Sequence, residues 1–225
     1  MTSIFQTHAI EFLKATLVTV ELTIVSLIIA TIIGLVFAFF KVSNIKVLGK
    51  IADFYIFIIR GMPLIVQLMF LYYGISSIFI LSDFTAGALA LGIHSGAYIA
   101  EIFRGAIQSI DRGQMEAARS LGMTYMKSMR RIILPQAFKR AIPALGNQFI
   151  IGLKDSSLVA YIAVSELFNH ALSAQAANYM PFETYFVVGI YYLILVLFFT
   201  ILFNKLEKKL DNGGKKKNDK IEEFA

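Results

Sequence analysis

No cysteine occurs among the 225 residues, and only 16% of them are charged. The first absence excludes structural disulfides and metal sites built from thiolates, although it says nothing about the cellular compartment. The second is well below the proportion usual in soluble domains, and hydrophobic residues make up 57% of the chain. Such a chain belongs in a lipid bilayer. Its length allows several spanning helices of about 20 residues each and leaves little for a soluble domain.

Other absences narrow the class of protein. No internal repeat and no GxxxxGK[ST] phosphate loop are present, so neither a tandem transporter fold nor an ATP site is encoded in this chain. The only adjacent nucleophile and base are Ser95 and His94, and neighbouring residues on a helix point in directions about 100° apart. We therefore expect a protein without an enzymatic site of its own, which needs a second subunit to enclose a path.

Five apolar runs are long enough to cross a membrane. They cover residues 15–40, 51–81, 84–107, 141–164 and 182–203. The second run is too long for one untilted helix, and Pro63, which has no amide donor, predicts a kink within it. The third run is rich in glycine, which predicts a buried span in close contact with its neighbours. These glycines are Gly87, Gly92, Gly96 and Gly105. The expected fold is an all-α membrane protein with five transmembrane helices.

Lysine and arginine follow the first, third and fifth runs, whereas the other connections contain none. The positive-inside rule then places the N-terminus outside and the C-terminus in the cytoplasm. Because this rule already accounts for the net charge of +6, nucleic acid is not expected as a partner. The charged tail, residues 207–225, is expected to be cytoplasmic and disordered beyond Asn212.

A polar, basic insert at residues 114–143 separates the third and fourth runs. Its small and apolar residues recur at helical spacing, which predicts a short helix that ends at Gly122, a turn, and a second helix that Leu134 and Pro135 stop. Two interpretations fit these residues equally well. The first helix either enters a groove of a partner protein or lies on anionic headgroups.

Seven residues of the insert form the pattern EAA, three residues, G, nine residues, I-x-L-P. They are Glu116, Ala117, Ala118, Gly122, Ile132, Leu134 and Pro135. This pattern resembles the cytoplasmic loop of binding-protein-dependent ABC transporter permeases. The stretches RGMPL at 60–64 and LKDSSL at 153–158 are similar to the polar amino acid branch of that family. The resemblance covers residues 15–206, so we treat residues 1–206 as one permease domain with its loop at 111–135.

The resemblance implies a type I ABC importer permease in the cytoplasmic membrane of a prokaryote, working in the import of polar amino acids. Its implied partners are a second permease subunit, ATPase subunits that bind ATP and Mg²⁺, and an extracytoplasmic binding protein; the chain itself holds no cofactor. Glu116 would anchor the loop in the ATPase by its charge, Ala117 and Ala118 would allow close approach, and Gly122 would set the turn. A stand-alone channel or secondary carrier is the alternative, but neither needs such a loop.

Candidates for the substrate path are the polar residues within the apolar runs. They are Lys154, Asp155, Ser156, Ser157, Gln67, His94 and Glu101. Ionisable groups there are costly and by default mark a path or a site. The alternatives are a Lys154–Asp155 pair that fixes helix packing or a gate, a packed core histidine for His94, and pairing of Glu101 with Arg104. The residues do not separate cationic from neutral amino acids, nor a homodimer from a heterodimer.

Overall fold

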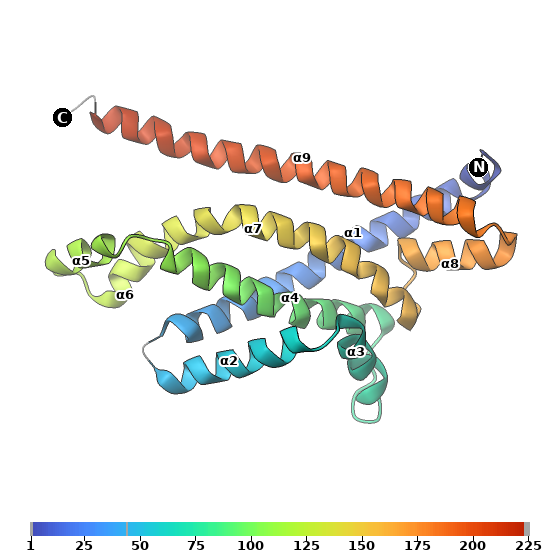
Figure 1. Cartoon of the computed structure of the whole chain (residues 1–225), viewed down its shortest axis with the longest axis horizontal. Coiled ribbons are helices and arrows are strands. Elements are labelled where there is room, and N and C mark those ends of the chain that lie inside the picture. The colour runs from blue at the N-terminus through green and yellow to red at the C-terminus, as the bar shows by residue number, and fades with distance from the viewer. Residues whose placement is uncertain (1, 44, 223–225) are drawn as a thin grey trace.

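The computed structural model describes the backbone of residues 2–43 and 45–222, and the side chains of 10–43 and 45–210. Every regular element in these residues is a helix, so the all-α prediction is confirmed. Most helices run along one long axis (Figure 1). The N-terminus and α8 (Leu167–Asn178) lie at one end of it, and α5 (Arg112–Ser120) and α6 (Tyr125–Ser128) lie at the other.

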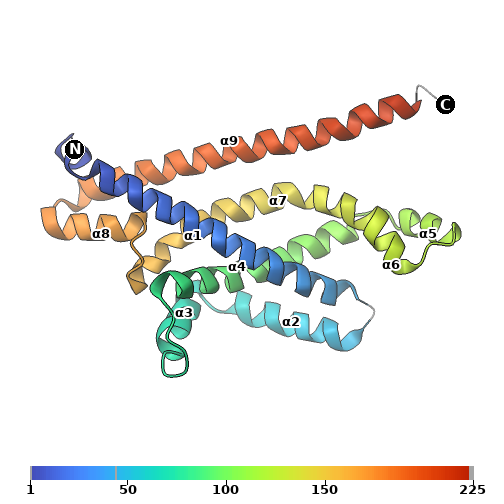
Figure 2. The ribbon, with the colours of Figure 1, turned by 180° about the vertical axis from the view of Figure 1, so that it is seen from behind.

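The centre of the molecule is the pair α1 (Thr2–Val42) and α4 (Asp83–Gln108), which cross along much of their length (Figure 2). Glycines make this approach possible. A Cβ atom at Gly34 would lie 2.5 Å from Ile99, and one at Gly92 would lie 2.6 Å from Ile29. The predicted burial of the third run is confirmed, because α4 is the most buried of the long apolar helices. Gly105 takes no part, since nothing lies within 4 Å of its Cβ position.

The second apolar run is broken at Pro63, as predicted. Helix α2 (Lys46–Gly61) ends there, and α3 (Leu64–Met69) continues through a π-helical turn, η1 (Phe70–Gly74), at an angle of 103° to α2. Proline disfavours helical dihedrals in the preceding residue, and Met62 is accordingly extended, with φ −109° and ψ 140°. As a result, α3 lies across the long axis of the molecule (Figure 1).

The second helix of the insert does not stop at Pro135, which corrects the sequence prediction. It passes from α6 through a π-helical turn, η2 (Met129–Ile133), directly into α7 (Leu134–Asp155). Pro135 occupies the first turn of α7, where its missing amide removes no α-helical hydrogen bond. The helix that contains the fourth apolar run therefore begins at Leu134, before residue 141. Its α-helical part also ends earlier, because Ser156–Ile162 form a 3₁₀ helix, η3.

The last helix, α9 (Pro181–Glu222), begins beside α8 and reaches the end of the molecule where α5 and α6 lie (Figure 1). It continues as helix through residues 213–222, where the sequence predicts disorder. Among the described residues, three helical segments are long and apolar enough to cross a membrane: Ile10–Val42, Asp83–Gln108 and Pro181–Leu210. The bent pair α2 and α3 would add a fourth. The count of five spans and the orientation stay predictions.

Candidate functional site

Helix α5 has well-defined caps at both ends. The carboxylate of Asp111 accepts a hydrogen bond from the amide of Gly113 at 2.6 Å, and Gly122 ends the helix with φ +79°. The amide of Gly122 donates to the carbonyl of Arg119 at 3.0 Å, and that of Met123 donates to Ala118 at 3.1 Å. This pair of bonds is a Schellman motif, which requires a left-handed residue at the glycine position. Gly122 thus sets the turn, as predicted.

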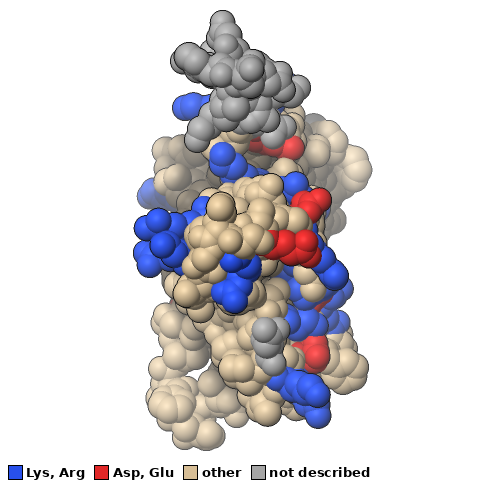
Figure 3. Space-filling view, turned by 90° about the vertical axis from the view of Figure 1, so that its left-hand side faces the viewer, with Lys and Arg blue, Asp and Glu red and all other residues tan. Residues whose placement is uncertain are grey.

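The outward face of the loop presents apolar side chains to solvent. Leu121 is 84% exposed and Met126 70% exposed, and Glu116 and Ala117 are exposed beside them. Figure 3 looks onto this end of the molecule, where an uncharged surface is bordered by lysines and arginines and, on one side, by acidic residues. The two alanines differ, however, because Ala118 is 2% exposed and faces the chain's own α6 and η2. Its small size serves packing within the loop, so the predicted close approach to a partner can involve only Ala117.

The second half of the sequence motif joins the loop to the body of the protein. Ile132 and Leu134 pack against a core cluster that contains Ile133, Ala137 and residues of α4. These contacts join the loop to α4 and α7 through closely packed side chains. Ile132 and Leu134 therefore connect the loop with the helices, whereas Pro135 is exposed at the start of α7.

A polar cavity of about 450 Å³ lies between α4 and α7 and is open to the outside. Its lining consists of Arg60, Tyr98, Glu101, Ile102, Ala144, Asn147, Gln148 and Ile151. The guanidinium of Arg60, at the end of α2, lies over the ring of Tyr98, 5.1 Å from its centroid. The cavity thus combines one cationic group, one carboxylate and two amides from three helices.

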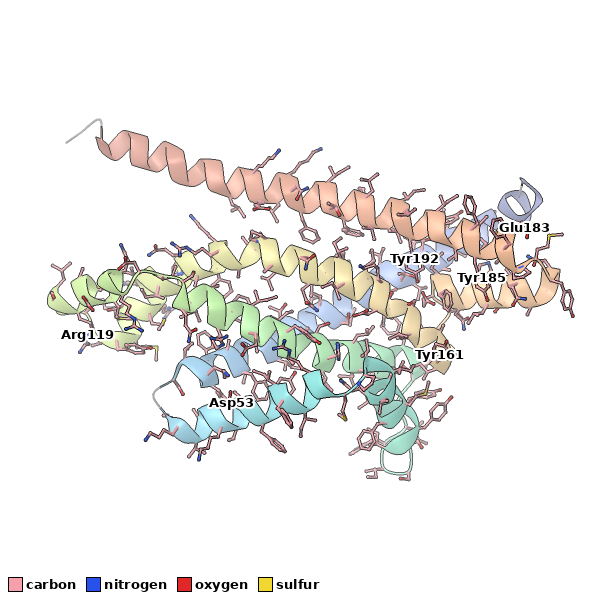
Figure 4. The ribbon with its side chains drawn as sticks, in the orientation of Figure 1. Asp53, Arg119, Tyr161, Glu183, Tyr185 and Tyr192 are labelled. Atoms are coloured by element: carbon pink, nitrogen blue, oxygen red, sulfur yellow. The ribbon has the colours of Figure 1, made fainter. Side chains whose placement is uncertain are left out.

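Glu101 belongs to an ion network at one end of this cavity. Its Oε2 accepts two hydrogen bonds from Arg104, at 2.6 and 3.0 Å, and its Oε1 lies 3.6 Å from the ammonium of Lys41. Lys41 also contacts Asp53 on α2 (labelled in Figure 4). The alternative interpretation of Glu101, a pair with Arg104, is therefore confirmed. The network joins α1, α2 and α4, and Glu101 still lines the cavity.

Gln67 and His94 meet at the bend between α2 and α3. The amide nitrogen of Gln67 donates to the carbonyls of Ile59 and Met62, at 2.8 and 3.0 Å, and lies 3.1 Å from Nδ1 of His94. These carbonyls belong to the last turn of α2, which has no helical donors for them. Gln67 therefore caps a broken helix, and both it and His94 lie outside the lining of the polar cavity.

We expect Gln67→Glu to destabilise the fold. The substitution replaces a donor that serves two part-buried carbonyls by an acceptor of the same size, at a cost of about 2 kcal/mol. Thermal unfolding in detergent measures the effect as a lower melting temperature. Gln136→Glu is the matched control, because its amide donates to one carbonyl, that of Ile132, within a continuous helix. Equal melting temperatures for the two variants would contradict the capping role.

The four residues at the end of α7 have different environments. Lys154 is exposed, Asp155 is half-buried, and Ser156 is fully buried with its hydroxyl donating to the carbonyl of Leu153 at 2.8 Å. The hydroxyl of Ser157 donates to the carbonyl of Lys154 at 2.7 Å. Among the described side chains no ion pair within 4.0 Å joins Lys154 to Asp155. Asp155 lies seven residues beyond Gln148, on the same face of α7 as the polar cavity.

Comparison with known proteins identifies the family. Residues 22–212 match the family described as "Binding-protein-dependent transport system inner membrane component". The chain belongs to this family. The permease is 39% identical over 203 residues to the arginine transport system permease protein ArtQ of Bacillus subtilis, an alignment that covers 89% of this chain and 93% of ArtQ. It is 36% identical over 195 residues to the glutamine transport system permease protein GlnP of Escherichia coli, covering 85% and 89% of the two chains.

Solved structures agree with this assignment. The permease superposes with a TM-score of 0.86 on a chain of an amino acid ABC transporter crystallised with histidines, at 41% identity and covering 92% of this chain and 97% of that one. A chain of the MetNI methionine ABC transporter, at 20% identity, gives a TM-score of 0.80 over 90% and 97% and shows the shared fold. This permease is therefore a membrane component of a binding-protein-dependent transport system, and the proteins that it resembles over most of its length are amino acid ABC transport permeases.

The sequence interpretation missed part of the polar cavity. The sequence drew attention to Arg60 only as part of the RGMPL stretch at 60–64, and Asn147 and Gln148 were not singled out. A signal was available for the two amides, since they stand next to each other inside an apolar run, where unpaired polar groups are costly. Arg60 carries a signal too, since it is a charge inside an apolar run, but its place beside α4 depends on the 103° bend after α2, which is a tertiary feature.

Proposed function

We propose that this permease forms the transmembrane path of an ATP-driven importer of polar amino acids in the cytoplasmic membrane of a prokaryote. In this proposal it has five spans, with the N-terminus outside and the C-terminus inside. It works with a second permease subunit, two ATPase subunits that bind ATP and Mg²⁺, and an extracytoplasmic binding protein. Movement of the ATPases reaches the path through the loop at 111–135.

The observation that carries the proposal is the exposed apolar face of α5 and α6. Large apolar side chains such as Leu121 and Met126 are costly in water, and a patch of them rimmed by charge is typical of a protein interface. The loop also carries the complete family motif from Glu116 to Pro135. Its firm packing onto α7 and α4 gives a mechanical route from that face to the polar cavity.

The chemistry of the cavity supports an amino acid as cargo. A zwitterion presents a carboxylate, which an arginine binds with two parallel hydrogen bonds, and an ammonium, which a carboxylate or amide oxygens accept. Arg60 supplies the first partner, and Glu101, Asn147 and Gln148 supply the second. Asp155, about two helical turns beyond Gln148 along α7, gives a second acidic position toward the end where α8 lies.

The fifth span of the proposal is α7. Its 22 residues give a helix of roughly 33 Å, enough to cross the hydrocarbon core. Charged residues lie near both of its ends, Lys139 and Arg140 at one and Lys154 and Asp155 at the other. Its middle packs against α4 and α9, which shields its polar side chains from lipid.

Uptake of a panel of labelled amino acids tests the proposal. The complex of permease, ATPase and binding protein is reconstituted in liposomes and supplied with labelled arginine, glutamine, histidine or aspartate. We expect accumulation of at least one of the first three when ATP is present on the side of the loop. Equilibration of several solutes without ATP or binding protein would instead support a channel or carrier.

A further inference from the structure

The one fully buried acidic side chain among the described residues is Glu166, which is 0% exposed. It lies between η3 and α8, outside the polar cavity and the loop. Its Oε1 accepts a hydrogen bond from the amide of Asn169 at 2.7 Å, so that it caps the first turn of α8. No basic side chain of residues 10–43 or 45–210 forms an ion pair with it.

The second oxygen of Glu166 joins two other helices. The hydroxyl of Tyr192 on α9 donates to Oε2 at 3.0 Å, and the hydroxyl of Thr19 on α1 lies 3.4 Å from it. The Thr19 oxygen in turn accepts the amide of Leu167, the first residue of α8, at 3.0 Å. One carboxyl group therefore links α1, α8 and α9.

The same cluster reaches η3. The side-chain amide of Asn169, whose backbone amide Glu166 caps, donates to the carbonyl of Ala160 in η3 at 3.4 Å. Ala163 ends η3 with φ +65°, a left-handed conformation that costs a residue with a Cβ roughly 1 kcal/mol or more. Strained residues of this kind persist where their surroundings over-determine them. Figure 4 labels Tyr192 on α9 and Tyr161 on η3.

We propose that Glu166 is a positioning residue, which holds η3 and the polar end of α7 in place against α1 and α9 and thereby fixes Asp155 in the transport path. The inference deepens the proposed function, because it rests on Asp155 and the polar cavity belonging to that path. Glu166 acts through Tyr192, Thr19 and the backbone of α8, and it does not itself touch the cargo. A displacement of about 1 Å at such a support can cost up to roughly 100-fold in rate.

Two readouts test this role in variants that preserve most of the packing. Glu166→Asp withdraws the carboxyl by one methylene, and Tyr192→Phe removes only the hydroxyl. Glu166→Gln keeps the size and one acceptor oxygen for the amide of Asn169, and its NH2 group can donate to the hydroxyl oxygen of Tyr192. We expect the first two to raise the apparent KM for uptake of the amino acid that the panel identifies by about 10-fold or more, and Glu166→Gln to stay within about threefold.

Because the chain has no cysteine, Leu13→Cys and Tyr161→Cys place two spin labels, on α1 and η3.

The distance between these labels is measured in the full chain in lipid nanodiscs and does not depend on transport. We expect one narrow distribution in the parent and in Glu166→Gln, and a broadened one in Glu166→Asp and Tyr192→Phe. Asn178→Ala is the matched control, since it breaks another α8–α9 bond, to Thr184, without touching η3. Unchanged distances and KM in both test variants would overturn the inference. If the distances broaden in the two test variants but the parent shows no ATP-driven uptake, the proposed function is wrong and the structural role of Glu166 still holds.

Titration gives an independent check. Burial raises the pKa of the Glu166 carboxyl, so the folded state favours its protonated form. That stabilisation is complete below the unfolded pKa of roughly 4.3 and is lost as the pH rises through the higher folded value. Glu166→Gln cannot titrate at this position. The melting temperature of the variant minus that of the parent should therefore rise as the pH increases above about 5. His170 and Glu11, which lie on α8 and α1 beside this site, are present in both proteins and cancel in the difference. A difference that does not vary with pH would contradict a buried, titrating Glu166.

Discussion

Gly122→Asp should abolish ATP-driven uptake while the protein still folds and inserts. Nothing lies within 4 Å of a Cβ atom at Gly122, so the substitution disturbs no packing within the chain. It does place a residue with a Cβ at φ +79°, at a cost of about 1–2 kcal/mol, and adds a negative charge to the face that we propose meets the ATPase. Reconstituted transporter should show uptake near background, and its ATP hydrolysis should no longer respond to loaded binding protein.

Two controls separate strain from a blocked interface. Gly122→Asn adds a side chain of similar size that tolerates the left-handed conformation and carries no charge, so we expect it to keep a substantial part of the activity. Gly49→Asp adds the same charge at a glycine of α2 with no atom within 4 Å of its Cβ position and no left-handed backbone. It should transport normally. Normal uptake in Gly122→Asp would show that this turn is only a helix end.

Arg60→Gln should weaken uptake of the cargo strongly. A bidentate, charge-assisted bond to a carboxylate contributes about 1.5–3 kcal/mol, so its loss should raise KM by roughly 10- to 100-fold. Arg60 forms no ion pair with a described acidic residue, and its guanidinium lies over Tyr98 at the wall of the cavity. Uptake kinetics with the amino acid identified by the panel measure the effect, and melting temperature reports folding.

Charge alone should not replace the guanidinium. Arg60→Lys keeps the positive charge but loses both the planar fork and the stacking on Tyr98, so it should recover only part of the uptake. Lys50→Gln, which removes a charge from the opposite end of α2, should leave KM unchanged. If Arg60→Gln transports as well as the parent, the carboxylate of the cargo is bound elsewhere and the cavity loses its proposed role.

Local sequence rules predicted the features that depend on neighbouring residues. The break at Pro63 and the turn at Gly122 both follow from backbone chemistry, and the structure contains both. The close contacts at Gly92 and Gly96 follow from glycine in a buried span. Pro135 was misjudged because a proline ends a helix only when an α-helical hydrogen bond must be given up, and here it stands in the first turn of α7 after a π-helical turn.

The site depended on tertiary structure and was only partly predictable. The family motif identified the loop, but only folding shows that Ala118 turns inward while Ala117 turns outward. Gln67 looked like a lining residue because an amide in an apolar run is conspicuous, and its true partners, two carbonyls of α2, exist only because of the bend. Glu166 was not among the predicted site residues, because a single acid in a polar segment does not indicate that three helices meet at it.

The central claim is that ATP hydrolysis by partner subunits drives amino acids through this permease. Its most direct test is the ratio of labelled amino acid imported to ATP hydrolysed, in liposomes that contain the permease, its ATPase and saturating binding protein. We predict uphill accumulation that stops without ATP. We also predict a fixed ratio of amino acid imported to ATP hydrolysed, which falls toward zero in Gly122→Asp because uptake is lost. Accumulation that continues without ATP, or that follows an ion gradient, would contradict it.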